Sequence, residues 1–253
     1  MKIIVICNRK GGCGKSTTAG AMYSYLAKVA KKNVLLLDFD SQCNVSYALG
    51  ADLAGPTLYD VLIGRVILRD ALQFLPEETK DYSCLVPGSE LLSNIDNGEA
   101  EIKIDLKAEL KSLDGVIDYV IIDTAPALAL LTGLALSIAD NVVVPVVADI
   151  YNIQGLLGVG ELVADVNPNA TIIGILLTRY RGRLLAVRRI EEMSKEVAGR
   201  MGVKVFKTKI REGITVVEAA MMQQGLFSYD VDCKSNVAQD YALFMKEILA
   251  EVK

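Results

Sequence analysis

Nine residues near the N-terminus combine glycines, lysines and hydroxyls in a spacing that suits phosphate binding. The segment reads Lys10-Gly11-Gly12-Cys13-Gly14-Lys15-Ser16-Thr17-Thr18 and follows an apolar run at 3–7. Glycines let successive backbone N–H groups turn toward one anion, Lys15 can reach the terminal phosphates of a nucleotide, and Ser16 offers a hydroxyl to Mg²⁺. A helix that begins after the glycines points its positive end at the same anion. A strand, a glycine turn and a helix in this order therefore predict a nucleotide phosphate site.

Three aspartates at the ends of apolar runs could serve the metal. Asp38 and Asp40 close the run that begins at Val34, and Asp123 follows 120–122. Because the carboxyl ends of parallel strands meet at one edge of a sheet, we expect these side chains beside the glycine loop. Any one of them could instead cap a helix or form a turn. The three together favour a magnesium site, because such carboxylates hold Mg²⁺ directly or through water.

Composition limits the chemistry that these residues can perform. The 253 residues include no His, which excludes histidine bases, histidine-dependent serine triads and histidine-ligated zinc. The five cysteines have no C-x-x-C spacing and no signal peptide precedes them, which favours a reduced, cytoplasmic setting. No apolar run reaches the roughly 18 residues needed to cross a bilayer. The net charge of −4 predicts neither nucleic acid nor membrane binding.

Short Val- and Ile-rich runs alternate with amphipathic stretches, which predicts a single α/β domain with a mostly parallel twisted sheet and helices on both faces. Strands are expected at 2–7, 34–38, 83–86, 117–122, 141–146, 171–178 and 203–206. Helices are expected at 16–30, 99–112, 129–138, 153–166, 184–201, 213–224 and 236–251, with short helices within 41–75. The last helix carries an apolar stripe that could bind a membrane surface. Docking onto the core of the domain is favoured, because a membrane-binding stripe would be expected to have more Lys and Arg beside it.

The glycine loop with its front lysine, the Asp38–Asn44 segment and the Asp123–Pro126 segment together resemble the ParA/MinD group of deviant Walker ATPases. Within that group the sequence is most similar to Soj-like ParA partition proteins. The resemblance continues through 144–149, 177–183 and 218–220, and so spans nearly the whole chain. It implies one P-loop ATPase domain over 1–253, without an N-terminal helix-turn-helix extension.

The resemblance also implies separate roles for the two loop lysines. Lys10 would cross the interface of an ATP sandwich homodimer and contact the partner's nucleotide, as an arginine finger does, whereas Lys15 would serve its own nucleotide. Asp40 would position the attacking water. The implied Mg²⁺ site comprises Ser16, Asp38, Asp40 and Asp123. The implied ATP site comprises Gly11, Gly12, Cys13, Gly14, Lys15, Ser16, Thr17, Thr178 and Arg211.

Some positions differ from the residues that are usual in the motifs of this group. Ser41 stands where Pro is common, Cys43 where Gly is common, and Cys13 where Val is frequent. A thiol can fill the space of a small apolar side chain, so we interpret Cys13 as a structural substitution. None of these changes removes a group that hydrolysis needs.

A strongly basic segment is hidden by the acidic total. From 179 to 211 there are eleven basic and three acidic residues, a charge of +8 that leaves −12 for the rest of the chain. A solvated helix face is the ordinary explanation, but a basic face without aromatics also suits sequence-independent contact with DNA phosphates. In the resembling family one DNA-binding arginine matches Arg183 and another falls on Thr215. The DNA-binding candidates are Arg181, Arg183, Arg188, Arg189, Lys207 and Lys209.

The resemblance thus implies a partition ATPase that binds DNA non-specifically as an ATP dimer, is stimulated by a ParB-type protein, and is cytoplasmic and nucleoid-associated without membrane contact. Two alternatives stay open. A MinD-like positioning ATPase would need a lipid-binding C-terminal helix, and a metal-insertion ATPase similar to NifH or CooC would need cysteines that bridge a metal across a dimer.

Overall fold

The computed structural model describes residues 1–75, 83–126, 129–147, 156–182 and 185–252. Its centre is a seven-stranded sheet in the order β3-β4-β2-β5-β1-β6-β7. All neighbouring strands are parallel except β3, which pairs antiparallel with β4 at one edge. The strands are β1 Lys2–Ile6, β2 Val34–Phe39, β3 Gln73–Phe74, β4 Cys84–Val86, β5 Tyr119–Thr124, β6 Asn141–Val147 and β7 Thr171–Thr178.

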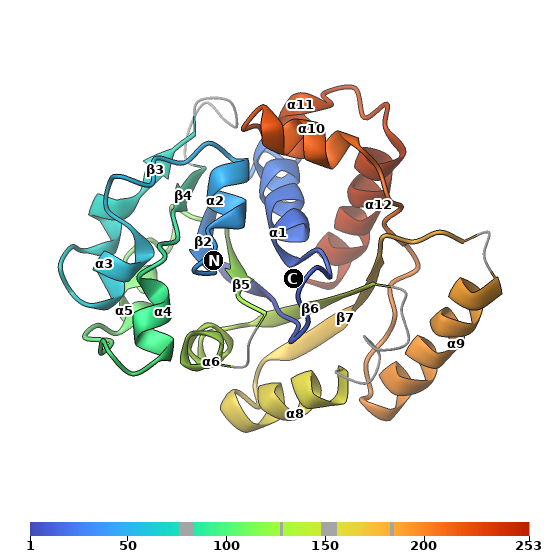
Figure 1. Cartoon of the computed structure of the whole chain (residues 1–253), viewed down its shortest axis with the longest axis horizontal. Coiled ribbons are helices and arrows are strands. Elements are labelled where there is room, and N and C mark those ends of the chain that lie inside the picture. Colours follow the sequence, from blue (N-terminus) through green and yellow to red (C-terminus); the bar gives the residue numbers. More distant parts are fainter. Residues whose placement is uncertain (76–82, 127–128, 148–155, 183–184, 253) are drawn as a thin grey trace.

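Helices cover both faces of this sheet (Figure 1). The face that carries α1 Lys15–Ser24 also holds a π-helical continuation Tyr25–Val29, α2 Asn44–Ala48, α11 Leu226–Tyr229 and α12 Asn236–Glu251. The opposite face holds α3 Leu58–Leu62, a 3₁₀ turn Leu68–Ala71, α4 Leu92–Asp96, α5 Leu106–Lys111, α6 Leu130–Ser137, α8 Leu156–Val166 and α9 Leu185–Arg200. The remaining helix, α10 Thr215–Met221, lies beside α2 and α11. The predicted fold class is confirmed.

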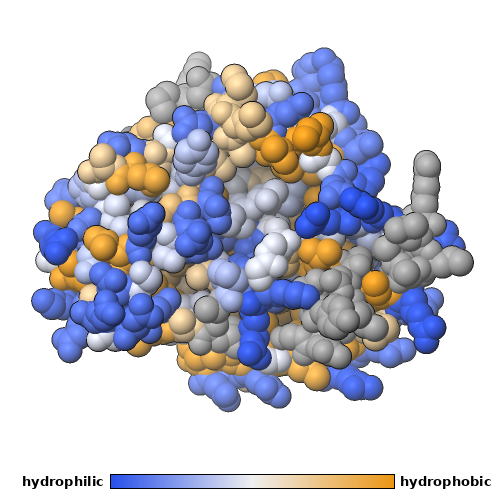
Figure 2. Space-filling model, viewed as in Figure 1, coloured by the Kyte–Doolittle hydropathy of each residue, from blue (hydrophilic) through white to orange (hydrophobic). Residues whose placement is uncertain are grey.

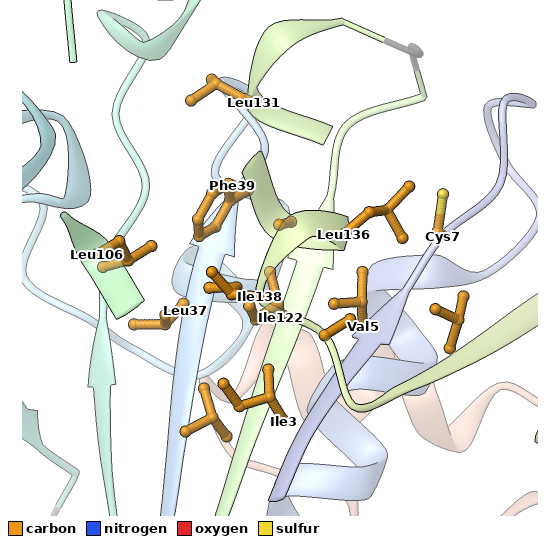
Figure 3. Packing of buried hydrophobic residues seen from close by; sticks show 14 of the residues in the cluster. Ile3, Val5, Cys7, Leu37, Phe39, Leu106, Ile122, Leu131, Leu136 and Ile138 are labelled. Carbon is orange, nitrogen blue, oxygen red and sulfur yellow. The ribbon is translucent and has the colours of Figure 1, made fainter. Parts of the chain in front are cut away.

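Alternation along the strands divides the core into two halves. Ile3 and Val5 of β1 point to the half that Figure 3 shows, with Leu37 and Phe39 of β2 and Leu136 of α6. Their neighbours Ile4 and Ile6 point to the other half, with Leu36. Because side chains alternate between faces, only a strand covered on both sides needs a continuous apolar run. This packing fixes the carboxyl ends of β1, β2 and β5 at one edge.

Two predicted elements are wrong. The helix expected at 99–112 begins only at Leu106, because the Asp105 carboxylate accepts hydrogen bonds from the backbone N–H groups of Lys107 (3.0 Å) and Ala108 (3.2 Å) and so caps it. The strand expected at 203–206 is reduced to an isolated bridge between Val205 and Ile175. The two-residue edge strand β3 was not predicted.

The C-terminal helix α12 docks onto the core as expected. Its apolar stripe is buried against α1 and the sheet and comprises Val237, Tyr241, Phe244, Ile248 and Val252. In the described ranges, no helix combines the length and apolar character that crossing a bilayer would require.

Candidate functional site

The glycine loop follows β1 and leads directly into α1, as the sequence predicts. Gly12 and Gly14 have φ values of +73° and +87°, a left-handed conformation that favours glycine. Gly14 precedes the first residue of α1, and its carbonyl accepts a hydrogen bond from the Thr18 N–H at 2.9 Å. The first turn of α1 therefore presents free N–H groups toward the loop, which suits an anion.

Two polar side chains brace this loop, Asn8, which the sequence did not single out, and Thr178. The buried Asn8 side chain donates to the Pro145 carbonyl of β6 (2.6 Å) and accepts from the Lys10 N–H (3.1 Å). The Thr178 hydroxyl donates to the Cys13 carbonyl at 2.8 Å, which ties the end of β7 to the loop. Thr178 is thus close to the phosphate loop, as expected, and its side chain has a structural role there.

The two loop lysines differ in their surroundings. Lys15 is only 6% exposed, and its ammonium donates to the Lys10 carbonyl at 3.2 Å. It lines a pocket of about 640 Å³ together with Gly11, Gly12, Gly14, Ser16, Thr17, Asp40 and Thr178. The Lys10 side chain does not contribute to the described lining of that pocket. The structure therefore brings one lysine to the pocket and leaves the other at its front.

The three aspartates meet at the predicted edge, but their environments differ. The strand register sets Asp38 of β2 directly beside Asp123 of β5, and both are fully buried. One Asp38 oxygen accepts from the Asp40 N–H (3.0 Å), and the other accepts from the Ser46 N–H (3.1 Å) and hydroxyl (2.6 Å). Asp40 reaches the pocket, and one of its oxygens accepts from the Gln42 N–H at 3.0 Å. Asp38 is therefore held by hydrogen bonds from Asp40 and Ser46, whereas Asp40 faces the pocket.

Asp123 is the carboxylate whose surroundings fit a metal. Neither of its oxygens has a hydrogen-bond partner among the described residues, although both are buried. Burial, and then the neighbouring Asp38 charge, raise its pKa well above the ordinary range, although the nearby Ser16 hydroxyl and Lys15 ammonium oppose this shift. Burial likewise raises the pKa of Asp38 to about 6. Burial of ionised carboxylates without a bound cation costs free energy, so this edge of the sheet is suited to Mg²⁺. In proteins Mg²⁺ is usually coordinated by one or two carboxylates together with substrate phosphates and water.

The pocket lining continues beyond the glycine loop. It includes Ile210, Glu212 and Gly213 after β7 and residues of α2, α10 and α12. Arg211 belongs to it as well, but its guanidinium is engaged by both oxygens of Asp240 on α12, at 2.8 and 2.6 Å. Arg211 therefore anchors the pocket wall to α12, and the sequence motif could not reveal this partner, which lies 29 residues further on.

Several basic residues of the segment 179–211 form ion pairs with acidic residues that lie close in space. Glu212 pairs with Arg179 (3.1 Å) and Arg181, and Glu191 pairs with Lys195 (2.9 Å) and Lys209. Glu251 of α12 pairs with Lys204 at 2.6 Å. Although partial burial opposes it, hydrogen bonds from Lys209, Lys195 and Tyr180 lower the pKa of Glu191 to about 2. Two of the DNA-binding candidates, Arg181 and Lys209, are thus held by local carboxylates.

The remaining candidates divide into two groups. Arg188 and Arg189 lie exposed on α9, Lys207 lies exposed after it, and no ion pair is recorded for these three within the described ranges. Arg200, at the end of α9, has the same character and was not a candidate. Arg183 lies outside the described residues. Three exposed arginines without a recorded ion pair thus lie on the described part of α9, on a helix that also exposes Glu192 and Glu196.

An exposed apolar face adjoins the pocket on the other side. Figure 2 shows hydrophobic surface over α10. The side chains are Ile214, Val217, Met221 and Met222, with exposures of 50% to 78%, and Tyr47 of α2 is also exposed. Contiguous apolar surface of this kind often marks a protein–protein contact.

Comparison with known proteins adds to this geometry. A family model described as an AAA domain matches residues 1–172. The sporulation initiation inhibitor protein Soj of Bacillus subtilis is 34% identical, with 98% of each chain covered. The chromosome-partitioning ATPase Soj of Treponema pallidum is 32% identical, with 98% of this chain and 97% of the relative covered.

Solved structures give the same fold. Apo McdA from Cyanothece is 25% identical, with a TM-score of 0.83, and the match covers 98% of this chain and 99% of that one. Cobyrinic acid a,c-diamide synthase from Mycobacterium smegmatis, with a bound ATP analogue and magnesium, is 27% identical, with a TM-score of 0.81 and coverage of 98% and 94%. The synthase structure contains an ATP analogue and magnesium, and in the present structure the glycine loop suits a nucleotide phosphate and Asp123 suits Mg²⁺.

Proposed function

Because this chain belongs to the ParA/MinD family of P-loop ATPases, we propose that it is a partition ATPase that pairs on binding ATP, binds DNA non-specifically in that state and releases it after hydrolysis. Its similarity to the Soj proteins supports partition as the process. The observation that carries the ATPase assignment is the buried Asp123, whose two oxygens have no partner among the described residues, directly beside the glycine loop.

The residues of the pocket have distinct tasks in this proposal. The loop N–H groups and Lys15 bind the phosphates, and Ser16 and Asp123 hold Mg²⁺, Asp123 directly or through water. Magnesium supplies charge neutralisation on the phosphate oxygens. Asp40 orients the attacking water and accepts its proton, while Asp38 fixes the backbone of Asp40 through the hydrogen bond at 3.0 Å.

Pairing of two copies would complete the site. Lys10 precedes the glycines of the loop and is not part of the described pocket lining, and in this proposal its ammonium serves the nucleotide of a second copy. A lysine supplied in this way stabilises charge on the transferring phosphoryl group. The apolar face of α10, next to the pocket, supports a protein partner on this side of the molecule. A ParB-type protein is the proposed activator.

The proposed DNA-binding face is α9 with Arg188 and Arg189, and Lys207 is a further candidate. Arg183 stays a candidate outside the described residues. Two half-faces on one dimer would multiply the phosphate contacts, so that binding becomes strong only in the ATP state. The packed C-terminal helix α12 offers no free apolar stripe for lipid, which favours DNA over the MinD-like alternative.

A gel shift with a duplex of arbitrary sequence tests this function. At about 50 mM salt the protein should retard the duplex with ATP and Mg²⁺ and leave it free with ADP. Equal retardation in both nucleotide states, or none in either, contradicts the proposal. Liposome co-sedimentation with ATP, the assay for the alternative, should show no enrichment in the pellet.

A further inference from the structure

A hydrogen-bonded chain behind the pocket connects three segments that are distant in the sequence. Gly88, after β4, donates its backbone N–H to the Ser46 hydroxyl oxygen at 3.0 Å. That hydroxyl donates to one Asp38 oxygen at 2.6 Å, and the other Asp38 oxygen accepts from the Asp40 N–H at 3.0 Å. The chain thus runs from the loop after β4, through α2, to the backbone of the residue that faces the pocket.

We infer that Ser46 is a positioning residue for ATP hydrolysis, which acts with Gly88 by holding Asp38 and so the Asp40 backbone in place. The inference rests on the ATPase activity proposed above. Ser46 is fully buried and does not line the pocket, so it cannot contact a nucleotide there itself.

The Ser46 hydroxyl makes contacts that the Ser46 backbone N–H cannot make in its place. The Ser46 N–H also reaches Asp38, at 3.1 Å, and would remain after removal of the hydroxyl. The hydroxyl alone both donates to Asp38 and accepts from Gly88. Its loss leaves the Gly88 N–H without that acceptor and loosens the Asp38 side chain, because one of the three hydrogen bonds that this carboxylate accepts is gone.

Gly88 adds a steric constraint to the same turn. A Cβ on this residue would lie 2.9 Å from the Asp40 carbonyl oxygen and 3.1 Å from the Asp38 carboxyl carbon. Both neighbours belong to the turn itself, and the nearer one is backbone, so an alanine must displace the turn. Ser46 from one side and Gly88 from another therefore determine where Asp40 stands.

This arrangement predicts an effect on kcat and little on nucleotide binding. The glycine loop and Lys15, which bind the phosphates, are braced separately by Asn8 and Thr178. A shift of the water-orienting residue slows the chemical step, because reacting groups must be held within a fraction of an ångström of their working positions.

The experiment compares full-length variants by steady-state ATPase assays with DNA present, and by titration with a fluorescent ATP analogue. We expect Ser46→Ala to lower kcat about tenfold, as the loss of a hydrogen bond to a charged group allows, with KM and ATP affinity within about twofold of wild type. Ser46→Thr, which keeps the hydroxyl, should retain most of the wild-type kcat. Gly88→Ala should resemble Ser46→Ala.

Ser24→Ala is the matched control. Ser24 is equally buried, and its hydroxyl also accepts a backbone N–H, that of Phe227 at 3.0 Å, but it lies on α1 away from the aspartates. Its removal should lower thermal stability by a similar amount and leave kcat unchanged. This separates positioning from a general loss of stability.

The outcomes distinguish the inference from the function on which it rests. If the wild type hydrolyses ATP, any one of three results overturns the inference alone. These are an unchanged kcat in Ser46→Ala, an equal loss of kcat in Ser24→Ala, and a kcat in Ser46→Thr as low as that in Ser46→Ala. A wild-type protein that binds ATP but does not hydrolyse it, with DNA present, overturns both.

Discussion

Replacement of Asp123 by asparagine should stabilise the nucleotide-free protein while abolishing hydrolysis. Asp123 and Asp38 are buried neighbours in adjacent strands, and neither Asp123 oxygen has a partner among the described residues. An isosteric neutral side chain removes the cost of confining this charge. Replacement of a poorly compensated buried charge commonly gains about 1–3 kcal/mol, which for a chain of this length corresponds to a melting temperature roughly 2–10 °C higher.

The assay is thermal unfolding of wild type and Asp123→Asn, each without nucleotide and with a non-hydrolysable ATP analogue and Mg²⁺. The nucleotide-free variant should melt higher than wild type, and addition of analogue and Mg²⁺ should raise the melting temperature of wild type more than that of the variant, because Asp123 serves the metal. Glu101→Gln, the same acid-to-amide change at an exposed residue for which no hydrogen bond or ion pair is recorded within the described ranges, serves as the control for unrelated shifts. A nucleotide-free variant that melts below wild type, or one that hydrolyses ATP at the wild-type rate, refutes this account of Asp123.

Three further predictions concern the charged surface. Arg188→Ala combined with Arg189→Ala removes four arginines from each proposed dimer. It should therefore weaken DNA binding in the ATP state and reduce the slope of log affinity against log salt by about 4, as measured by fluorescence anisotropy at several salt concentrations; an unchanged slope contradicts the α9 assignment. Glu212→Gln should free Arg179 and Arg181 and tighten DNA binding, in the same assay, by roughly a few-fold at low salt. Glu191→Gln should lower the free energy of unfolding by about 1–2 kcal/mol at pH 7, a figure that allows for the solvent exposure of its lysine partners. Because the folded-state pKa of Glu191 is lowered from 4.5 to about 2, wild type should lose this stability as the pH falls from 4.5 toward 2, and urea unfolding should show a flatter acid dependence in the variant.

Local patterns in the sequence predicted the loop and the sheet because their causes are local. The glycines at 12 and 14 occupy the left-handed positions that the loop requires, and the apolar runs became strands covered on both faces. The helix expected at 99–112 failed for a tertiary reason. The Lys103 N–H donates to the Leu62 carbonyl at 2.8 Å, which holds the chain extended until Asp105 caps α5.

The roles of individual charged residues depended on neighbours that the sequence does not bring together. Asp38 and Asp123 are equivalent as strand-end carboxylates, yet Ser46 satisfies one while the other has no partner among the described residues. The basic segment ends one residue before Glu212, and Glu251 joins it from α12, so a count along the chain overstated its free charge. Such pairings need the fold before they can be recognised.

The central claim is that ATP controls pairing and DNA binding through Lys10. The most direct test is light scattering and DNA retention by wild type, Lys10→Ala and the surface control Lys111→Ala, each saturated with ATP and Mg²⁺. Wild type and Lys111→Ala should form dimers that retain DNA, whereas Lys10→Ala should bind ATP yet stay monomeric, retain no DNA and hydrolyse no ATP. A Lys10→Ala protein that pairs, retains DNA and hydrolyses ATP as wild type does would contradict the claim.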